Sequence, residues 1–453
     1  MSQQPPTPLP VGAVPRRQAF AFWLRLGFIS FGGPAGQIAI MQRELVEQRG
    51  WISQERFAHA LNYCMMLPGP EAQQLATYLG WLMHRTLGGV VAGLLFILPS
   101  LLLLIGLSYL YMAHGEQPVV GALLYGIKPA VAAIVLHAVH RLAQRCLIDP
   151  RKRPWPWLLA LMGFIWLAVL DLSFVWLISG AVLLGLFLAR RAPLALSGPE
   201  VQTSRPLDGV RSALVEVDTP APPHTRPHRG RLLVVLTVGL ILWGLPMAAL
   251  VNVWGWQGTL TQMGAFFTRA ALLTFGGAYA VLPYVQQAAV DQYQWLTTAQ
   301  MMDGLALGES TPGPLIMVVA FVAYVGGWTH QVLGPQALPA GAALAALVAC
   351  WFTFLPSFIF ILAGGPWVEA ARGRPGWTLP LQAVYCVVIG VMAHLAWSFL
   401  QAVAWAPSRG MLDVTALLMV AAGLWALLRW RWTVVQLLAA GAVIGLLLAF
   451  LRG

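Results

Sequence analysis

The sequence predicts an all-α polytopic membrane protein made of two inverted repeats whose helices are broken or re-entrant. Three observations predict it. Hydrophobic residues make up 58% of the chain and charged residues only 9%, whereas a soluble domain carries roughly 25% charged residues. One set of motifs occurs twice at a constant spacing. Positive charge flanks the first set of motifs and is missing from the loops of the second.

The motifs indicate an internal duplication. Each copy contains an FGG motif, a tryptophan and a PGP motif, at Phe31-Gly32-Gly33, Trp51 and Pro68-Gly69-Pro70 and, 244 residues later, at Phe275-Gly276-Gly277, Trp295 and Pro312-Gly313-Pro314. Arg25 and Arg269 share that spacing, and Leu98-Pro99-Ser100 recurs as Leu355-Pro356-Ser357 after a short insertion. A single FGG or PGP motif would be weak evidence, because glycine and proline often interrupt apolar helices. Ungapped recurrence of both motifs is typical of a repeat.

Apolar runs of about 20 residues are long enough to cross a bilayer. Such spans are predicted at 90–112, 119–141, 232–254, 341–363 and 381–401. Four further runs form two closely turned pairs, predicted to be helical hairpins, at 157–170 with 174–189 and at 411–428 with 432–451.

The motif segments, at 20–41, 57–83, 266–285 and 301–327, are apolar but interrupted near their middles. Proline removes a backbone donor and clashes with the preceding helical turn. In hydrocarbon a broken backbone is tolerated only where protein or a water-filled cavity satisfies the freed groups. These segments are therefore expected to lie inside the bundle and to line a site.

The distribution of charge predicts the orientation of each copy. The net charge of +11 lies mainly in short loops and a linker, where it sets orientation, so nucleic-acid binding is not expected. The first-copy arginines, among them Arg43, Arg49, Arg56 and Arg141, can all be cytoplasmic if the FGG and PGP segments are re-entrant hairpins. No Lys or Arg lies between Arg269 and Arg372, as expected of an upside-down copy. The unmatched span 232–254 supplies the extra crossing, which gives an inverted-repeat transporter.

The chain divides into five parts. Residues 1–15 form a polar, proline-rich tail without the features of a signal peptide, and 16–189 form the first repeat. Residues 190–231 are proline-rich and polar, which predicts a disordered cytoplasmic linker. Residues 232–254 form the connecting transmembrane helix, and 259–453 form the second repeat.

The F-G-G-P signature, F-G-G-A in the second copy, and the paired PGP motifs resemble the bacterial chromate ion transporters in their long two-domain form. The resemblance implies a multi-pass protein of the bacterial inner membrane that exports chromate as a proton-driven antiporter, and not an enzyme. Its implied partners are the chromate or sulfate oxyanion and the lipid bilayer, with the assembly left open between a monomer and a homodimer. The alternatives are a permease for sulfate or another divalent oxyanion and, less favoured, a membrane-bound chromate reductase, for which no flavin, haem or thiol site is visible.

A dianion in a low-dielectric site needs positive charge and hydrogen-bond donors, and half-helices that begin at the breaks would offer free N–H groups. The predicted substrate-binding residues are Arg25, Phe31, Gly32, Gly33, Pro34, Pro68, Gly69, Pro70, Lys128, Arg269, Phe275, Gly276, Gly277, Pro312, Gly313 and Pro314. The competing interpretation is that glycine and proline only allow close helix packing. Lys128 could equally be a snorkelling lysine.

Glu71 and Glu309 are the predicted proton-coupling residues, although each could instead cap a helix start. His59, His137 and His140 are weaker candidates for a proton relay. The four cysteines, Cys64, Cys146, Cys350 and Cys386, lack metal-ligand or disulfide spacing. The sequence therefore predicts no metal, no other cofactor and no catalytic residue. The copies also differ, since Pro34 becomes Ala278 and Gln37 becomes Val281, and the first copy keeps more polar residues.

Overall fold

The computed structural model describes residues 14–31, 33–115, 117–147, 154–170, 174–191, 225, 227–275, 278–370, 378–405 and 412–452. Within these ranges the elements are helices, apart from an isolated bridge between Trp405 and Leu412. Six helices of the described ranges are long and apolar enough to cross a membrane. The prediction of an all-α polytopic membrane protein is confirmed.

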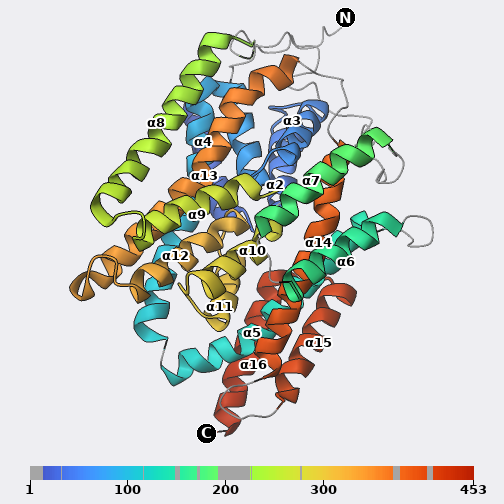
Figure 1. Ribbon diagram of the computed structural model, residues 1–453, viewed down its shortest axis with the longest axis vertical. Helices are drawn as coiled ribbons and strands as arrows, with labels where there is room; N and C mark the ends of the chain where they lie inside the picture. The colour runs from blue at the N-terminus through green and yellow to red at the C-terminus, as the bar shows by residue number, and fades with distance from the viewer. Residues whose placement is uncertain are drawn as a thin grey trace, which may run out of the picture.

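Five of the long helices match the five predicted spans, and the sixth, α16 (Val434–Arg452), matches the last run of the second predicted hairpin. The five are α4 (Glu71–His114), α5 (Pro118–Cys146), α8 (Arg229–Trp254), α13 (Leu338–Ala370) and α14 (Thr378–Ala404). Shorter apolar helices complete the predicted hairpins, at α6 (Pro154–Ala168), α7 (Phe174–Arg191) and α15 (Val414–Arg429). In Figure 1, α8 starts at one end of the molecule, and α16 finishes at the opposite end.

The motif segments form short helices that stop at the motifs. In the first copy these are α1 (Arg16–Ile29), α2 (Gly33–Gln42) and α3 (Gln54–Met66), and in the second α9 (Thr259–Leu273), α10 (Ala278–Gln286), α11 (Thr298–Ser310), the short η5 (Leu315–Met317) and α12 (Val318–Thr329). The longest of them, α9, has 15 residues, or about 22 Å at 1.5 Å per residue. A hydrocarbon core is about 30 Å thick, so each is too short to cross it alone.

Helix α4 contains a sharp turn near its start. His84 and Arg85 leave helical geometry, and Arg85 has φ 59°. Beyond them the chain folds back on itself, because Gly89 packs against Thr77 and Trp81. The segment 71–83 is therefore a short arm antiparallel to the long span that follows it, and it forms with α3 a hairpin that has the first PGP motif at its tip.

Equivalent positions in the two copies take the same local conformation. The chain forms a π-helix at Arg43–Gln48 and again at Gln287–Gln292, 244 residues later. After each π-helix the duplicated tryptophan donates its backbone N–H, Trp51 to the Leu45 carbonyl at 2.8 Å and Trp295 to the Ala289 carbonyl at 2.7 Å. The duplicated sequence thus specifies the same turn twice.

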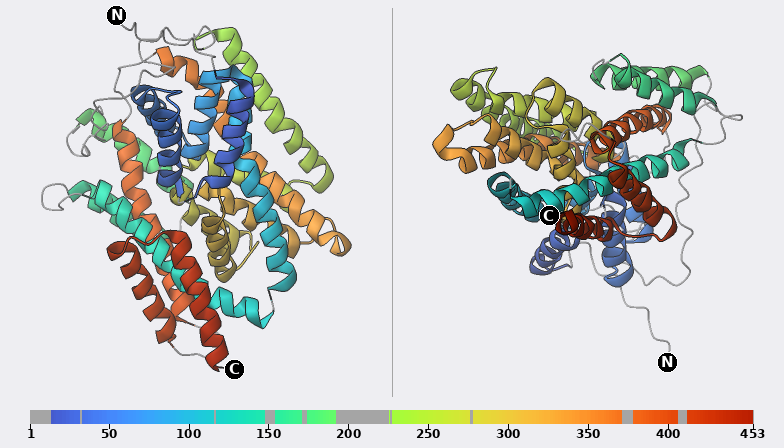
Figure 2. Two further views of the ribbon diagram at one scale, coloured as in Figure 1. Left: turned by 180° about the vertical axis from the view of Figure 1, so that it is seen from behind. Right: turned by 90° about the horizontal axis from the view of Figure 1, so that it is seen from below.

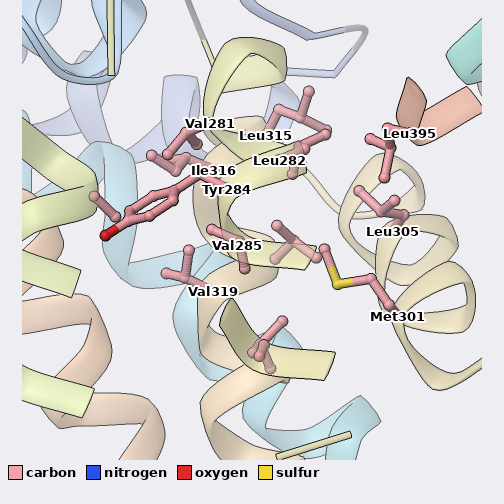
Figure 3. Packing of buried hydrophobic residues seen from close by; sticks show 14 of the residues in the cluster. Val281, Leu282, Tyr284, Val285, Met301, Leu305, Leu315, Ile316, Val319 and Leu395 are labelled. Carbon is pink, nitrogen blue, oxygen red and sulfur yellow. The ribbon is translucent and has the colours of Figure 1, made fainter. Parts of the chain in front are cut away.

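The second copy forms the centre of the larger hydrophobic core. Figure 3 shows side chains of α10, α11, η5, α12 and α14 packed together, among them Leu282, Met301, Leu305, Leu315 and Leu395. The first copy packs around Trp23, Trp81 and Phe57 in a second cluster. Helix α5 contacts α14, α15 and α16, and both views of Figure 2 show the red helices lying beside the teal α5.

The predicted tail and linker lie almost wholly outside the described residues. Of the tail, Val14 and Pro15 are described, and of the linker 190–191, 225 and 227–231. Helix α8 begins at Arg229, slightly before the predicted start of the connecting helix at residue 232.

Candidate functional site

The PGP loop of each copy bonds to the FGG break of the other copy. The Gly69 N–H donates to the Thr274 carbonyl at 2.7 Å, and the Gly313 N–H donates to the Ser30 carbonyl at 2.8 Å. Ser30 and Thr274 are equivalent positions, each at the end of the helix before FGG. The two hydrogen bonds are therefore reciprocal, and we call this pair of contacts the interlock. The breaks thus contact one another in two pairs, and these two glycine N–H groups bond to carbonyls.

Glycine is required in both loops by conformation and by space. Gly69 has φ +125° and Gly313 has φ +108°, values that side chains rarely adopt. A Cβ on Gly69 would lie 2.4 Å from Ser357 Oγ, and one on Gly313 would lie 2.6 Å from Ser100 Cβ. Ser100 and Ser357 are the serines of the duplicated Leu-Pro-Ser motif, so each PGP loop crosses the long helix of the other copy at that serine.

Each PGP loop is held by a different glutamine of the first copy. The buried Gln37 amide donates to the Gly313 carbonyl and, at 3.4 Å, to the Ser30 carbonyl. The buried Gln74 amide donates to the Pro68 carbonyl at 2.7 Å. The equivalent residues, Val281 and Val318, cannot make such bonds. Sequence analysis did not select the glutamines as site residues, although the change from Gln37 to Val281 was visible.

A cavity of about 420 Å³ is lined mainly by α2, α3 and α5 of the first copy, with single residues from α4, α10, α14, α15 and α16. This volume is far above the 10–15 Å³ or so that one water needs. Its wall includes the start of α2 and the polar or charged side chains of Gln42, Glu71, His137, Arg141 and Tyr279. The cavity therefore combines a helix N-terminus with a guanidinium, an imidazole, a phenol and a carboxyl group.

Four of the sequence candidates line this cavity: Gly33, Pro34, Glu71 and His137. Arg141 was treated in the sequence only as an orientation charge. It lies one turn after His137 on α5, and residues four apart share a helix face, which is a signal that could have identified it. Tyr279 stands where the first copy has Ala35, so only a comparison of the two copies would have drawn attention to it.

The Tyr279 hydroxyl links the cavity to a buried carboxyl group. It donates to Glu309 Oε1 at 2.5 Å. Glu309 lies on α11, is 6% exposed and is not part of the cavity wall. The two predicted proton-coupling residues therefore occupy different places, Glu71 in the wall and Glu309 behind it.

The predicted cationic ligands lie outside this cavity wall. Arg25 and Arg269 are exposed on α1 and α9, and Arg269 Nε donates to its own helix at the Ala265 carbonyl, 3.3 Å away. Lys128 Nζ lies 3.7 Å from Asp303 Oδ2, which also accepts from the Tyr111 hydroxyl at 3.0 Å. The structure therefore brings Lys128 to a carboxylate, and neither arginine lines the cavity.

The remaining motif residues divide by burial. Phe31 is 40% exposed and Phe275 half-buried, whereas Pro70, Pro312, Gly313 and Pro314 are buried. Gly32, Gly276 and Gly277 lie outside the described residues. All three residues of the second PGP motif are thus buried, whereas in the first motif only Gly69 and Pro70 are buried.

Arg56 belongs to a buried ion pair. The charge pattern placed it among the flanking arginines that set orientation, and the structure adds that its side chain is 1% exposed and lies 3.4 Å from Glu369 on α13. The Tyr78 hydroxyl donates to the same carboxylate. Residue type and spacing could not reveal this pair, because the partners are more than 300 positions apart.

The structure gives no metal centre within the ranges that it describes, since no three His, Cys, Asp or Glu side chains gather there. The four cysteines are free thiols.

Comparison with known proteins identifies relatives of both halves. The family model described as "Chromate transporter" matches residues 17–186 and again 261–446. A chromate transport protein of Pseudomonas aeruginosa is 32% identical over 383 residues, covering 83% of this chain and 79% of the relative. A chromate transport protein of Cupriavidus metallidurans is 27% identical over 455 residues, covering 99% of this chain and 98% of the relative. No solved structure matches.

Proposed function

Since this chain belongs to the chromate transporter family, we propose that it carries the chromate dianion outward across the bacterial inner membrane as a transporter and not an enzyme. The observation that carries the proposal is the cavity, whose wall joins the start of α2 to Arg141 and Tyr279. Relatives named as chromate transport proteins support the choice of anion.

The cavity offers the groups that an oxyanion needs. The Arg141 guanidinium presents a planar fork of donors that fits a tetrahedral oxyanion. The first N–H groups of α2 have no partner within the helix, and the helix dipole favours an anion there. The Tyr279 hydroxyl adds a donor, while the Glu71 carboxylate opposes the dianion until a proton neutralises it. We therefore place the main contact at Arg141, and Arg25, Arg269 and Lys128 stay predicted ligands.

The proton-motive force supplies the energy for export in this proposal. Moving one elementary charge across the membrane changes its free energy by about 2.3 kcal/mol per 100 mV. Export of a dianion from a cell with a negative interior is therefore favoured by about 4.6 kcal/mol per 100 mV. The electrical part of the force thus acts on the anion itself. Glu71 and Glu309 are the carboxyl groups through which a proton would be coupled.

We also propose that the two copies are inserted in opposite orientations. The reciprocal bonds of the interlock support a two-fold relation between them. In Figure 1, α8 runs along one side of the molecule, and α9 begins near its lower end. The extra crossing by α8 and the charge pattern both support opposite orientations for the two copies.

Transport in everted membrane vesicles tests the function. Energised vesicles that contain the protein should accumulate chromate, and vesicles treated with an uncoupler, or prepared without the protein, should not. The same cavity would also suit a sulfate permease, because sulfate is a tetrahedral dianion like chromate. Accumulation of sulfate, with chromate entering only when sulfate is absent, would favour that alternative. Loss of chromate without accumulation would indicate a reductase and would contradict the proposal.

A further inference from the structure

Tyr279 stands between the cavity and Glu309. Its side chain lines the cavity, and its hydroxyl donates to Glu309 Oε1 at 2.5 Å. Glu309 is 6% exposed and lies three residues before the second PGP motif, whose loop forms half of the interlock. The protonation state of Glu309, which lies behind the cavity wall, can thus affect the cavity through the Tyr279 hydroxyl.

The direction of this hydrogen bond depends on the proton of Glu309. An ionised carboxylate only accepts hydrogen bonds, whereas a carboxylic acid also has one donor. With Glu309 ionised, the Tyr279 proton is committed to Glu309 and the lone pairs of the phenol oxygen are left toward the cavity, where they repel an oxyanion. With Glu309 protonated, the acid donates to the phenol oxygen and the Tyr279 O–H becomes free to donate to the anion.

We propose that Glu309 binds one proton each time the cavity binds its oxyanion, and that the Tyr279 hydroxyl couples the two events. The inference rests on the proposed function and adds a direction of coupling: proton and anion move together, instead of being exchanged as the resemblance implied. A dianion with one proton carries one net negative charge, so the membrane potential still drives it outward. The pH difference opposes the outgoing proton, so only the electrical part of the proton-motive force drives export in this scheme.

Other titratable groups face the same space and must be separated from Glu309. Helix α5 contributes His137 and Arg141, and α4 contributes Glu71. On α11 itself, Asp303 is held by Lys128 and Tyr111. Glu71 meets the cavity directly, so its charge acts on the anion by repulsion, whereas Glu309 acts through a hydrogen bond that Tyr279→Phe removes.

Binding calorimetry on the purified full chain in lipid nanodiscs tests the coupling. Chromate is titrated at several pH values and in buffers of different ionisation enthalpy, which gives the number of protons taken up per anion. The wild-type protein should take up about one proton, and its affinity should rise up to tenfold per unit fall in pH, the limit for one coupled proton. Glu309→Gln should take up none and bind with little dependence on pH. Tyr279→Phe should bind more weakly and also lose proton uptake.

Tyr284→Phe is the matched control. Tyr284 lies on the same helix, but its ring packs against Phe174 and Phe266, and it is not part of the cavity wall. It should keep both the affinity and the proton uptake of the wild type.

Three outcomes separate the possibilities. Full proton uptake in both Glu309→Gln and Tyr279→Phe would overturn the inference. Loss of uptake in Glu71→Gln or His137→Asn, with uptake intact in Glu309→Gln, would assign the proton to the cavity wall and would also overturn it. If the wild-type protein binds sulfate but not chromate, with the same proton uptake, the proposed substrate fails while the coupling stands.

Discussion

Arg56 and Glu369 form an ion pair in which both side chains are 1% exposed and the charged atoms lie 3.4 Å apart. The pair joins α3 of the first copy to α13 of the second, close to the Tyr78 hydroxyl. Removing one partner of such a pair leaves an uncompensated buried charge, whereas replacing both partners can be nearly neutral.

Arg56→Gln or Glu369→Gln should therefore destabilise the protein by about 3–5 kcal/mol, and the double variant should recover part of that loss. Thermal unfolding in detergent, with membrane abundance, measures the effect. Arg49→Gln is the comparison variant, because Arg49 is 30% exposed in its pair with Glu44 and its loss should cost less than that of the fully buried Arg56. Equal losses in Arg49→Gln and Arg56→Gln would contradict this account of the buried pair.

Gly313→Ala should impair folding or transport through a clash with Ser100 Cβ. Gly50→Ala is a matched control, since Gly50 also has positive φ, at +60°, but nothing lies within 4 Å of its position for Cβ. The control should pay only the conformational cost of about 1–2 kcal/mol. Adding Ser100→Gly should partly rescue Gly313→Ala. Chromate uptake per molecule in the membrane is the measurement, and failure of the rescue would show that the serine contact is not the cause.

Arg141→Gln should weaken the apparent affinity for chromate at least tenfold, because a hydrogen bond to a charged group is worth about 1.5–3 kcal/mol and about 1.4 kcal/mol corresponds to one decade. Arg141→Lys should rescue only partly, since lysine lacks the planar fork. The concentration dependence of vesicle uptake gives the affinity.

Arg25→Gln and Arg269→Gln belong in the same experiment. The sequence predicts that each weakens binding about tenfold, with the larger loss at Arg25. If both variants bind normally and Arg141→Gln does not, the cavity arginine is the ligand. If Arg141→Gln binds chromate with the affinity of the wild type, Arg141 is not the main anion contact in the cavity.

Opposite insertion of the copies can be tested at the equivalent first residues of α3 and α11. Single cysteines at Gln54→Cys and Thr298→Cys, in a protein without its native cysteines, should react with an impermeant thiol reagent from opposite sides of the membrane. Labelling of both from one side would end the inverted-repeat proposal.

The sequence by itself determined the elements and the duplication. Length and apolar content alone predict the long helices, because a segment in hydrocarbon must satisfy its backbone internally. The repeated Phe-Gly-Gly and Pro-Gly-Pro motifs locate the breaks, since positive φ and a missing donor are local properties of glycine and proline. Glu71, Gly33 and Pro34 were identified from this local pattern, and all three line the cavity.

Only the tertiary structure decided which distant groups meet. Glu369 and Arg56 pair although they are 313 positions apart in the sequence. Lys128 lies beside Asp303, on a helix far from it in the sequence. In the sequence, Arg141 is one of many flanking positive charges, and Tyr279 is only a difference between the two copies. The structure brings both into one cavity wall with the start of α2. Contacts of this kind depend on the packing angle and register of whole helices, which no local pattern of residue types records, and so the partners within the site came from the fold.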